Sequence, residues 1–126
     1  MATHSQSADR SEEVLKDLGL RDVTEKLKGV TGDIRRRFNP VRIILFGSYA
    51  SGKTRPESDV DLLVVAPVRP NWREAQSFGM ELRRNFGLEL HLLFMGETEF
   101  EETRDVVGGL AFPASRSGKI LYETRP

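Results

Sequence analysis

Residues 46–65, FGSYASGKTRPESDVDLLVV, constrain the fold more than any other part of the chain. From Gly47 to Thr54 the letters match G-x-x-x-x-G-K-[ST], the phosphate-binding loop of P-loop proteins. In such proteins the Lys-Thr pair begins a long helix whose N-terminus holds the phosphates. Here Pro56 disfavours a helix, and an apolar run begins about five residues after Thr54. The loop is therefore predicted to handle phosphate in a fold other than the P-loop fold.

The order of the carboxylates and the chain length also argue against the P-loop fold. Asp59 and Asp61 precede their apolar run, whereas a P-loop enzyme places a magnesium-binding Asp after a separate apolar strand. The parallel sheet of that fold needs repeated strand-helix-strand units, and only about 72 of the 126 residues follow the motif. The same residues must therefore serve another fold.

Asp59 and Asp61 lie two residues apart in a predicted strand. Side chains at this spacing share one face of a strand, with Cα atoms about 6.5 to 7 Å apart. Burying such a pair without a counter-charge is costly, and a divalent cation is the usual remedy. Upstream, Gly47 allows a tight turn, and Ser48 with the N–H groups after it can hold a phosphate. These residues predict a nucleotide site with Mg²⁺, where two ions about 4 Å apart can support displacement at phosphorus.

The remaining chain predicts a single small domain. Apolar spacing and turn residues give helices over 11–18, 22–38 and 70–86 and a short one from 98, and strands over 41–46, 59–66, 88–95 and 118–123. Trp72 is expected in the buried stripe of the third helix. This order predicts an α+β (mixed α/β) fold, a small mixed sheet flanked by helices. Residues 11–126 are expected to form the domain, behind a disordered tail over 1–10.

Composition excludes several classes of function. Lys plus Arg and Asp plus Glu both number 19, so no excess of positive charge points to nucleic acid. No apolar run approaches the roughly 20 residues of a membrane span and no signal peptide opens the chain, so we expect a cytoplasmic protein without a membrane partner. The chain has no cysteine, so a metal would be bound by oxygen or imidazole.

Two segments, GSYASG over 47–52 and SDVDLLV over 58–64, resemble the signature of the minimal nucleotidyltransferases of the DNA polymerase beta superfamily. That signature is a strand, GS-x-A-R-G, a variable loop and S-D-x-D-L-x-V. The resemblance extends more loosely over residues 23–122, including EFEE and the closing G-x-x-L-Y. It implies a polymerase-beta-like fold that transfers a nucleoside monophosphate from a nucleoside triphosphate, ATP above all, to a hydroxyl with loss of pyrophosphate. The implied roles are nucleotide binding by Gly47, Ser48, Lys53 and Ser58, and metal binding by Asp59 and Asp61.

One departure from that signature lies in the phosphate loop. Ser51 occupies the position where the family usually has Arg, which removes a cation that could contact phosphate. Lys53 and Arg55 lie close enough in sequence to take its place.

A second departure concerns the third catalytic carboxylate of the family, expected on the strand over 88–95. Counting back nine residues from Phe100 places that position at His91, and Glu89 is the nearest carboxylate on the same face. Three alternatives follow. Glu89 reaches the metal, or the neutral imidazole of His91 acts as base on a two-carboxylate site, or the site binds nucleotide and turns over poorly.

Two functional hypotheses follow from these residues. The first is a transferase acting on a protein or small-molecule hydroxyl; the family resemblance implies a HEPN-type toxin as partner, modified with AMP by its antitoxin. The alternative is a binding module that acts by contact with a partner protein, its catalytic site weakened at Ser51 and His91.

Overall fold

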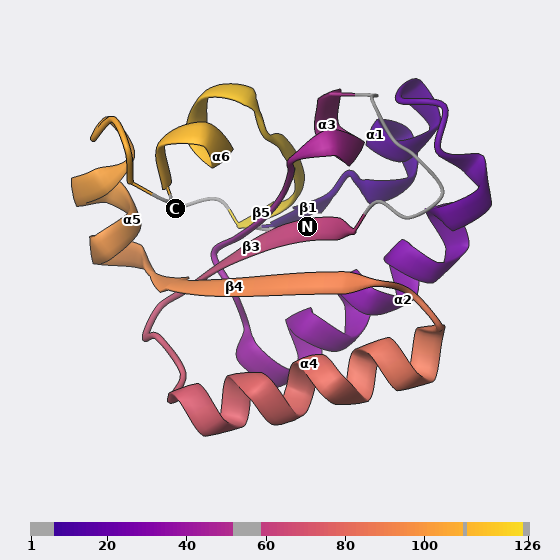
Figure 1. Cartoon of the computed structure of the whole chain (residues 1–126), viewed down its shortest axis with the longest axis horizontal. Helices are drawn as coiled ribbons and strands as arrows, with labels where there is room; N and C mark the ends of the chain where they lie inside the picture. The colour runs from indigo at the N-terminus through magenta and orange to yellow at the C-terminus, as the bar shows by residue number, and fades with distance from the viewer. Residues whose placement is uncertain (1–6, 52–58, 110, 125–126) are drawn as a thin grey trace, which may run out of the picture.

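The computed structural model describes residues 7–51, 59–109 and 111–124, which form a five-stranded sheet with helices on both faces (Figure 1). The helices are α1 Ser11–Asp17, α2 Arg21–Phe38, α3 Ser48–Ser51, α4 Trp72–Phe86, α5 Glu97–Thr103 and α6 Ala111–Ser117. The strands are β1 Ser7–Asp9, β2 Arg42–Phe46, β3 Val60–Ala66, β4 Leu90–Gly96 and β5 Lys119–Thr124. The predicted α+β class with a small mixed sheet is confirmed.

Strand order in the sheet is β1-β5-β2-β3-β4. The pairs β1·β5, β5·β2 and β2·β3 are antiparallel, and β3·β4 is parallel. The two strands that flank the G-x-x-x-x-G-K-[ST] match, β2 and β3, are therefore direct antiparallel neighbours. A P-loop would instead be followed by a helix that crosses over to a parallel strand. The antiparallel pairing confirms that the motif does not mark a P-loop.

The central strand β3 is buried on both of its faces, because helices cover each side of the sheet. On one face Leu62 and Val64 join a core that includes Leu27 and Ile34 of α2 and Leu82 of α4. On the other face Leu63 and Val65 join a smaller core under α5 and α6, which includes Phe100, Ala111 and Ala114. In Figure 1 α4 lies below the sheet, and α5 and α6 lie above it. No helix among the described residues is long and apolar enough to cross a membrane.

The N-terminal end of the described chain is a strand, which corrects the prediction of a tail over 1–10. Residues 7–9 form β1, whose Asp9 lies opposite Tyr122 of β5. The Asp9 carboxylate also accepts hydrogen bonds from the backbone N (3.0 Å) and Oγ (2.6 Å) of Ser11 at the start of α1. A tail prediction failed here because the pairing partner lies at the opposite end of the chain. Residues 1–6 lie outside the described residues.

Helix α4 begins at Trp72 rather than at the predicted residue 70. Asn71 caps it, since its side-chain oxygen accepts a hydrogen bond from the backbone N of Glu74 (2.8 Å). Trp72 itself is 75% exposed, so the prediction that it belongs to the core is wrong. The buried positions of the helix are Phe78, Gly79 and Leu82. Trp72 lies in the first turn, before the stripe that packs on the sheet.

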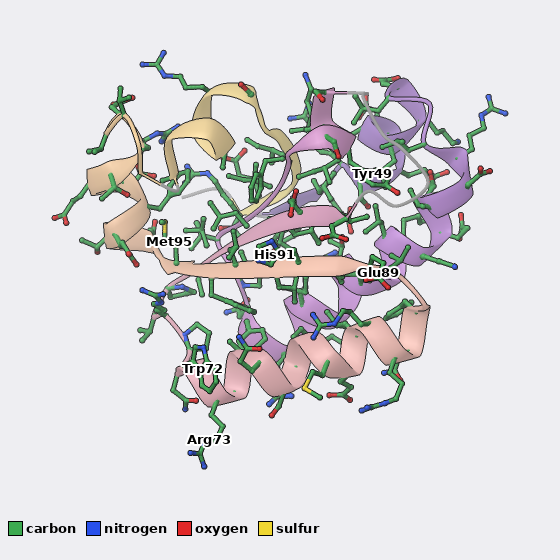
Figure 2. All side chains as sticks on the ribbon, in the orientation of Figure 1. Tyr49, Trp72, Arg73, Glu89, His91 and Met95 are labelled. Carbon is green, nitrogen blue, oxygen red and sulfur yellow. The ribbon has the colours of Figure 1, made fainter. Side chains whose placement is uncertain are left out.

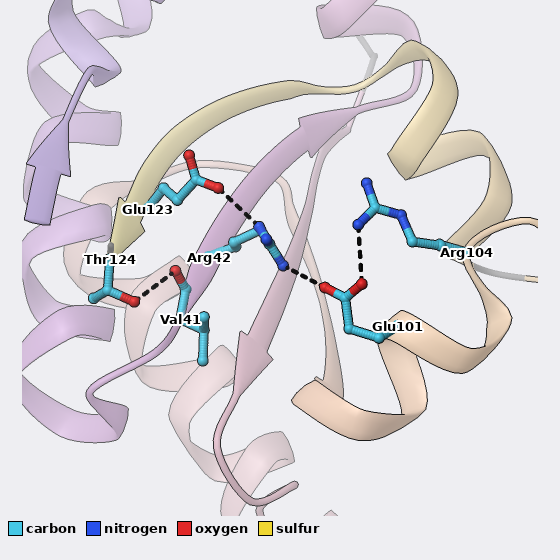
Figure 3. Close-up of polar contacts among 6 residues, drawn as sticks. All are labelled: Val41, Arg42, Glu101, Arg104, Glu123 and Thr124. Atoms are coloured by element: carbon cyan, nitrogen blue, oxygen red, sulfur yellow. Dashed lines mark hydrogen bonds and ion pairs between the residues drawn. The ribbon is translucent and has the colours of Figure 1, made fainter. Parts of the chain in front are cut away.

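A half-buried arginine, Arg42, ties α5 to the sheet (Figure 3). Arg42 of β2 donates from Nε to Glu123 of β5 (3.0 Å) and from Nη1 to Glu101 of α5 (2.9 Å). Burial lowers the pKa of Arg42, but these two acceptors outweigh burial and raise its pKa overall. A hydrogen bond from Arg104, followed by that from Arg42, holds the pKa of Glu101 below its ordinary value. Arg42 therefore stays charged and joins three elements.

Replacing Arg42 with methionine should lower the free energy of unfolding by about 1 to 2 kcal/mol, because Glu123 loses its hydrogen-bond donor and Glu101 keeps only the one from Arg104. The measurement is urea unfolding followed by circular dichroism. Arg69→Met is the matched control, since Arg69 meets Glu99 of the same helix α5 at 3.5 Å with 62% of its side chain exposed. The control should change stability by less than about 0.5 kcal/mol. Equal losses in both variants would contradict the anchoring role of Arg42.

Candidate functional site

A glycine turn after β2 forms one wall of the candidate site. Gly47 has φ of 75°, in the left-handed region that favours glycine. Its carbonyl accepts hydrogen bonds from the backbone N of Ala50 (3.1 Å) and of Ser51 (3.2 Å), which closes the single turn of α3. A Cβ at position 47 would overlap Oδ2 of Asp61 and lie 3.2 Å from its Cγ. Only glycine allows both this turn and this close approach of the carboxylate.

The Asp61 carboxylate lies between this turn and β4. In the sheet Asp61 is opposite Phe46 of β2 on one side and His91 of β4 on the other. Its side chain is 24% exposed, and its Oδ1 lies 3.2 Å from Nδ1 of His91. An ionised carboxylate can only accept, so Nδ1 of His91 is assigned the proton and Nε2 keeps a lone pair. The fold thus places the Asp61 carboxylate against both Gly47 and His91.

Asp59 and Glu89 lie at the same end of the sheet, each just before its strand. The predicted strands over 59–66 and 88–95 begin later than expected, at Val60 and Leu90. The backbone N of Val60 donates to the carbonyl of Glu89 (2.8 Å), so the parallel pairing continues toward both residues. Asp59 and Glu89 are exposed. Within the described ranges, Asp61 lies at hydrogen-bond distance from His91, and no hydrogen bond or ion pair joins it to Glu89. Figure 2 shows Glu89 nearer the beginning of β4 than His91.

The other predicted binding residues divide into two groups. Ser48 is the first residue of α3 and is half-buried beside Gly47, and its carbonyl accepts a hydrogen bond from Oγ of Ser51 (3.0 Å). Ser51, at the position of the usual Arg, therefore closes the turn. Lys53 and Ser58 lie outside the described residues, as does Arg55.

The carboxylates suit magnesium better than the imidazole does. Magnesium prefers oxygen ligands and usually takes one or two carboxylates together with substrate phosphates. Asp59 and Asp61 supply carboxylates of this kind, whereas His91 supplies nitrogen. In the part of the chain that the structure describes, no three His, Cys, Asp or Glu side chains gather as a metal site. The donor set fits an ion held by two carboxylates and completed by phosphate oxygens.

Sequence reasoning missed the contribution of α4 to this site. Nη1 of Arg83 donates to the carbonyl of Leu90 (3.1 Å), which fixes the start of β4 next to His91. Gln76, Gly79 and Arg83 line a hollow of about 140 Å³ together with His91. These three residues recur at helical spacing, and the middle one is small. This pattern in the sequence could have indicated that α4 lines a hollow beside His91.

Comparison with known families and proteins gives consistent results. Residues 27–110 match the family described as Nucleotidyltransferase domain. A protein of Methanocaldococcus jannaschii, provisionally named a protein adenylyltransferase, is 38% identical over 52 residues. That match covers 41% of this chain and 52% of the archaeal protein, so the chain matches about half the length of this relative.

Solved structures share the fold. A crystal structure described as a toxin-antitoxin with AMP-PNP has a TM-score of 0.57 at 18% identity, over 90% of this chain and 73% of that chain. A mutant of the toxin-antitoxin MntA-HpeT has a TM-score of 0.55 at 21% identity, over 77% of this chain and 72% of that chain. The family match spans most of the chain, and the antiparallel β2·β3 pair, the glycine turn and the Asp61 carboxylate all lie within it. This chain belongs to the nucleotidyltransferase domain family.

Proposed function

We propose that this chain transfers a nucleoside monophosphate, AMP from ATP by preference, to a hydroxyl group on a protein in the presence of Mg²⁺. The observation that carries the proposal is the Asp61 carboxylate held between the Gly47 turn and His91, at the sheet end where Asp59 also lies. The provisional name of the archaeal relative, a protein adenylyltransferase, supports a protein acceptor and AMP. The similar toxin-antitoxin structure with AMP-PNP, an ATP analogue, supports the nucleotide.

The residues around Gly47 would bind the triphosphate. Ser48 and the backbone N–H groups at the start of α3 follow the glycine turn directly and are the available donors for phosphate oxygens. Asp59 and Asp61 would repel a triphosphate unless cations lie between them, and their oxygens are the donors that would hold Mg²⁺. Bound magnesium would neutralise phosphate charge and stabilise the charge that develops in transfer.

In the proposed step the acceptor hydroxyl oxygen forms a bond to the α-phosphorus, and the bond from that phosphorus to the pyrophosphate oxygen breaks. The hydroxyl proton goes to Nε2 of His91, which is 60% exposed on its side chain and can meet an incoming acceptor. Oδ1 of Asp61 accepts the hydrogen bond from Nδ1–H and holds the ring in the tautomer that leaves Nε2 free. Pyrophosphate leaves with the negative charge.

The proposed acceptor is a toxin protein of the HEPN type, with this chain as its antitoxin in the cytoplasm, where ATP and Mg²⁺ are available. The similarity to toxin-antitoxin structures supports a protein partner. A third similar structure, another mutant of the toxin-antitoxin MntA-HpeT, has two aspartates, two residues apart, replaced by glutamate. The same spacing separates Asp59 from Asp61 here.

A binding module without turnover is the second candidate, favoured by His91 and Ser51 at positions where the family has a carboxylate and an arginine. Such a module would bind its partner and show no transfer. The two candidates differ in one observable, which is covalent labelling of a protein by ATP.

Asp59→Asn combined with Asp61→Asn should lower transfer of label from α-labelled ATP to protein by about 10³-fold or more, because the phosphate charge loses its cation ligands. The assay adds Mg²⁺ and cell extract, and labelled protein is counted after denaturation. Asp17→Asn is the control, since Asp17 is an exposed carboxylate at the end of α1 that the proposed step does not use. Parent protein that binds its partner normally and labels nothing would favour the binding module.

Gly47→Ala should weaken ATP binding at least tenfold, because the added Cβ displaces the Asp61 carboxylate. Gly108→Ala is the matched control: Gly108 has φ of 90° but a Cβ there meets no atom within 4 Å. Both changes should cost about 1 to 2 kcal/mol of stability from the backbone alone. Calorimetry with ATP and Mg²⁺ separates them, and equal ATP affinities for the two variants would argue against the Gly47–Asp61 contact as the nucleotide site.

His91→Ala should lower kcat by about 10² to 10⁴-fold with ATP affinity changed less than twofold, because the proton acceptor is lost. His91→Asp should also lower kcat if the ring accepts the proton. Single-turnover transfer at saturating ATP and Mg²⁺ measures both. A rise in kcat for His91→Asp would show that this position serves as a third metal ligand instead.

A further inference from the structure

Two adjoining hollows between α4 and β4 form one groove that starts at His91. The first, about 140 Å³, is the hollow that His91 shares with Arg83. The second, about 320 Å³, extends to Trp72 and Phe94. Both are lined by Ala75, Gln76, Leu92 and Leu93, so they are continuous. We call this surface the α4–β4 groove; it leads away from the candidate site along the edge of the sheet.

The floor of the groove is an unpaired strand edge. β4 is the last strand in the order β1-β5-β2-β3-β4, whereas the opposite edge ends in β1, a strand of three residues. The Glu89 carbonyl points toward β3, where it accepts a hydrogen bond from the backbone N of Val60. Because the backbone N–H and C=O groups of successive strand residues point to opposite sides, those of Leu90, Leu92 and Phe94 point away from β3, to the unpaired side of β4.

One of these outward-pointing groups, the Leu90 carbonyl, already accepts a hydrogen bond from Arg83. Among the described residues no other hydrogen bond reaches the outward groups of β4. Leu92 and Phe94 therefore present backbone donors and acceptors to a further strand.

The far end of the groove carries an exposed aromatic side chain. Trp72 is 75% exposed, and Val68 in the preceding loop is 81% exposed. Figure 2 shows Trp72 at the beginning of α4, near the end of β4 that carries Met95. Tryptophan is one of the side chains enriched among residues that dominate binding energy at protein interfaces. The groove thus has a catalytic residue at one end and an apolar anchor at the other.

We propose that the α4–β4 groove binds the acceptor protein as an extended segment added to the edge of β4, with its hydroxyl beside His91 and an apolar side chain against Trp72. This inference rests on the proposed function and names the place and form of the acceptor. Continuity with the candidate site through His91 is what assigns the groove to the acceptor.

Strand geometry sets the spacing of the two side chains. His91 lies on the sheet face of Asp61, and Phe94 lies three residues later on the α4 face. Three residues of strand span about 10 Å and reverse the side-chain direction. An acceptor segment paired with β4 would therefore carry its apolar residue three positions from the hydroxyl residue, pointing to the opposite face.

The test uses a synthetic seven-residue peptide with a central tyrosine and leucine three positions before and after it, which serves either strand direction. With ATP and Mg²⁺ present, the peptide should slow hydrogen exchange at the amides of Leu92 and Phe94, and its tyrosine should accept label from ATP. Replacing both leucines of the peptide with alanine should raise KM for the peptide at least fivefold.

Two variants of the chain test the groove directly. Trp72→Ala removes the anchor and Gln76→Trp fills the groove, and each should raise KM for the peptide at least tenfold with ATP affinity changed less than twofold. Met80→Ala is the control, because Met80 is 54% exposed on the same helix and lines neither hollow. It should leave both quantities unchanged. Unchanged peptide KM in both groove variants would overturn the proposal.

Three other outcomes also decide the matter. ATP binding without peptide protection at Leu92 and Phe94 overturns the groove assignment and leaves the proposed function standing. Protection of these amides without peptide, lost on dilution, means that a second copy of the chain occupies the edge, and it overturns the proposal. Absence of ATP binding by the parent protein removes the proposed function and the groove assignment with it.

Discussion

The close approach of the Asp61 carboxylate to the backbone of Gly47 is the contact on which the site depends. It exists because β2 and β3 are antiparallel neighbours whose register sets Phe46, the last residue of β2, opposite Asp61. The turn that follows must begin with a residue that has no Cβ and accepts a left-handed backbone, and glycine alone meets both conditions. The N–H groups at the start of α3 that are proposed to bind phosphate and the carboxylate that is proposed to hold Mg²⁺ are thereby placed side by side.

The fold keeps this carboxylate accessible while it buries the rest of the same strand face. Leu63 and Val65 lie under α5 and α6, and Asp61, two residues earlier on that face, lies beyond their cover. Arg42 contributes by tying α5 to β2 and β5, so the helix that closes one end of the face is held by a charge network. One half of this sheet face is therefore buried and stabilises the fold, and the other half is open and carries the candidate site. The open half adjoins the unpaired edge of β4.

Much of the fold and part of the site could be predicted because their signals are local. The glycine turn, the Asp pair and the apolar run after it occupy one short stretch of sequence, whereas the antiparallel pairing of the two flanking strands is seen only in the folded sheet. His91 was found by counting, but its contact with Asp61 depends on the parallel register of β3 and β4 and could not be read from spacing. Trp72 was misplaced because helical periodicity gives a face of α4 but not where the sheet beneath it ends.

The sequence by itself determined the local chemistry: a left-handed turn at Gly47, two carboxylates two residues apart, and strands and helices of the expected kinds. Tertiary structure alone decided which imidazole meets Asp61, that β4 keeps a free edge, that Trp72 faces solvent and that residues 7–9 pair with the last strand. The physical reason is the distance along the chain over which each kind of interaction acts. Turn and strand preferences act over a few residues, whereas contact, exposure and pairing depend on segments that only the packed sheet brings together.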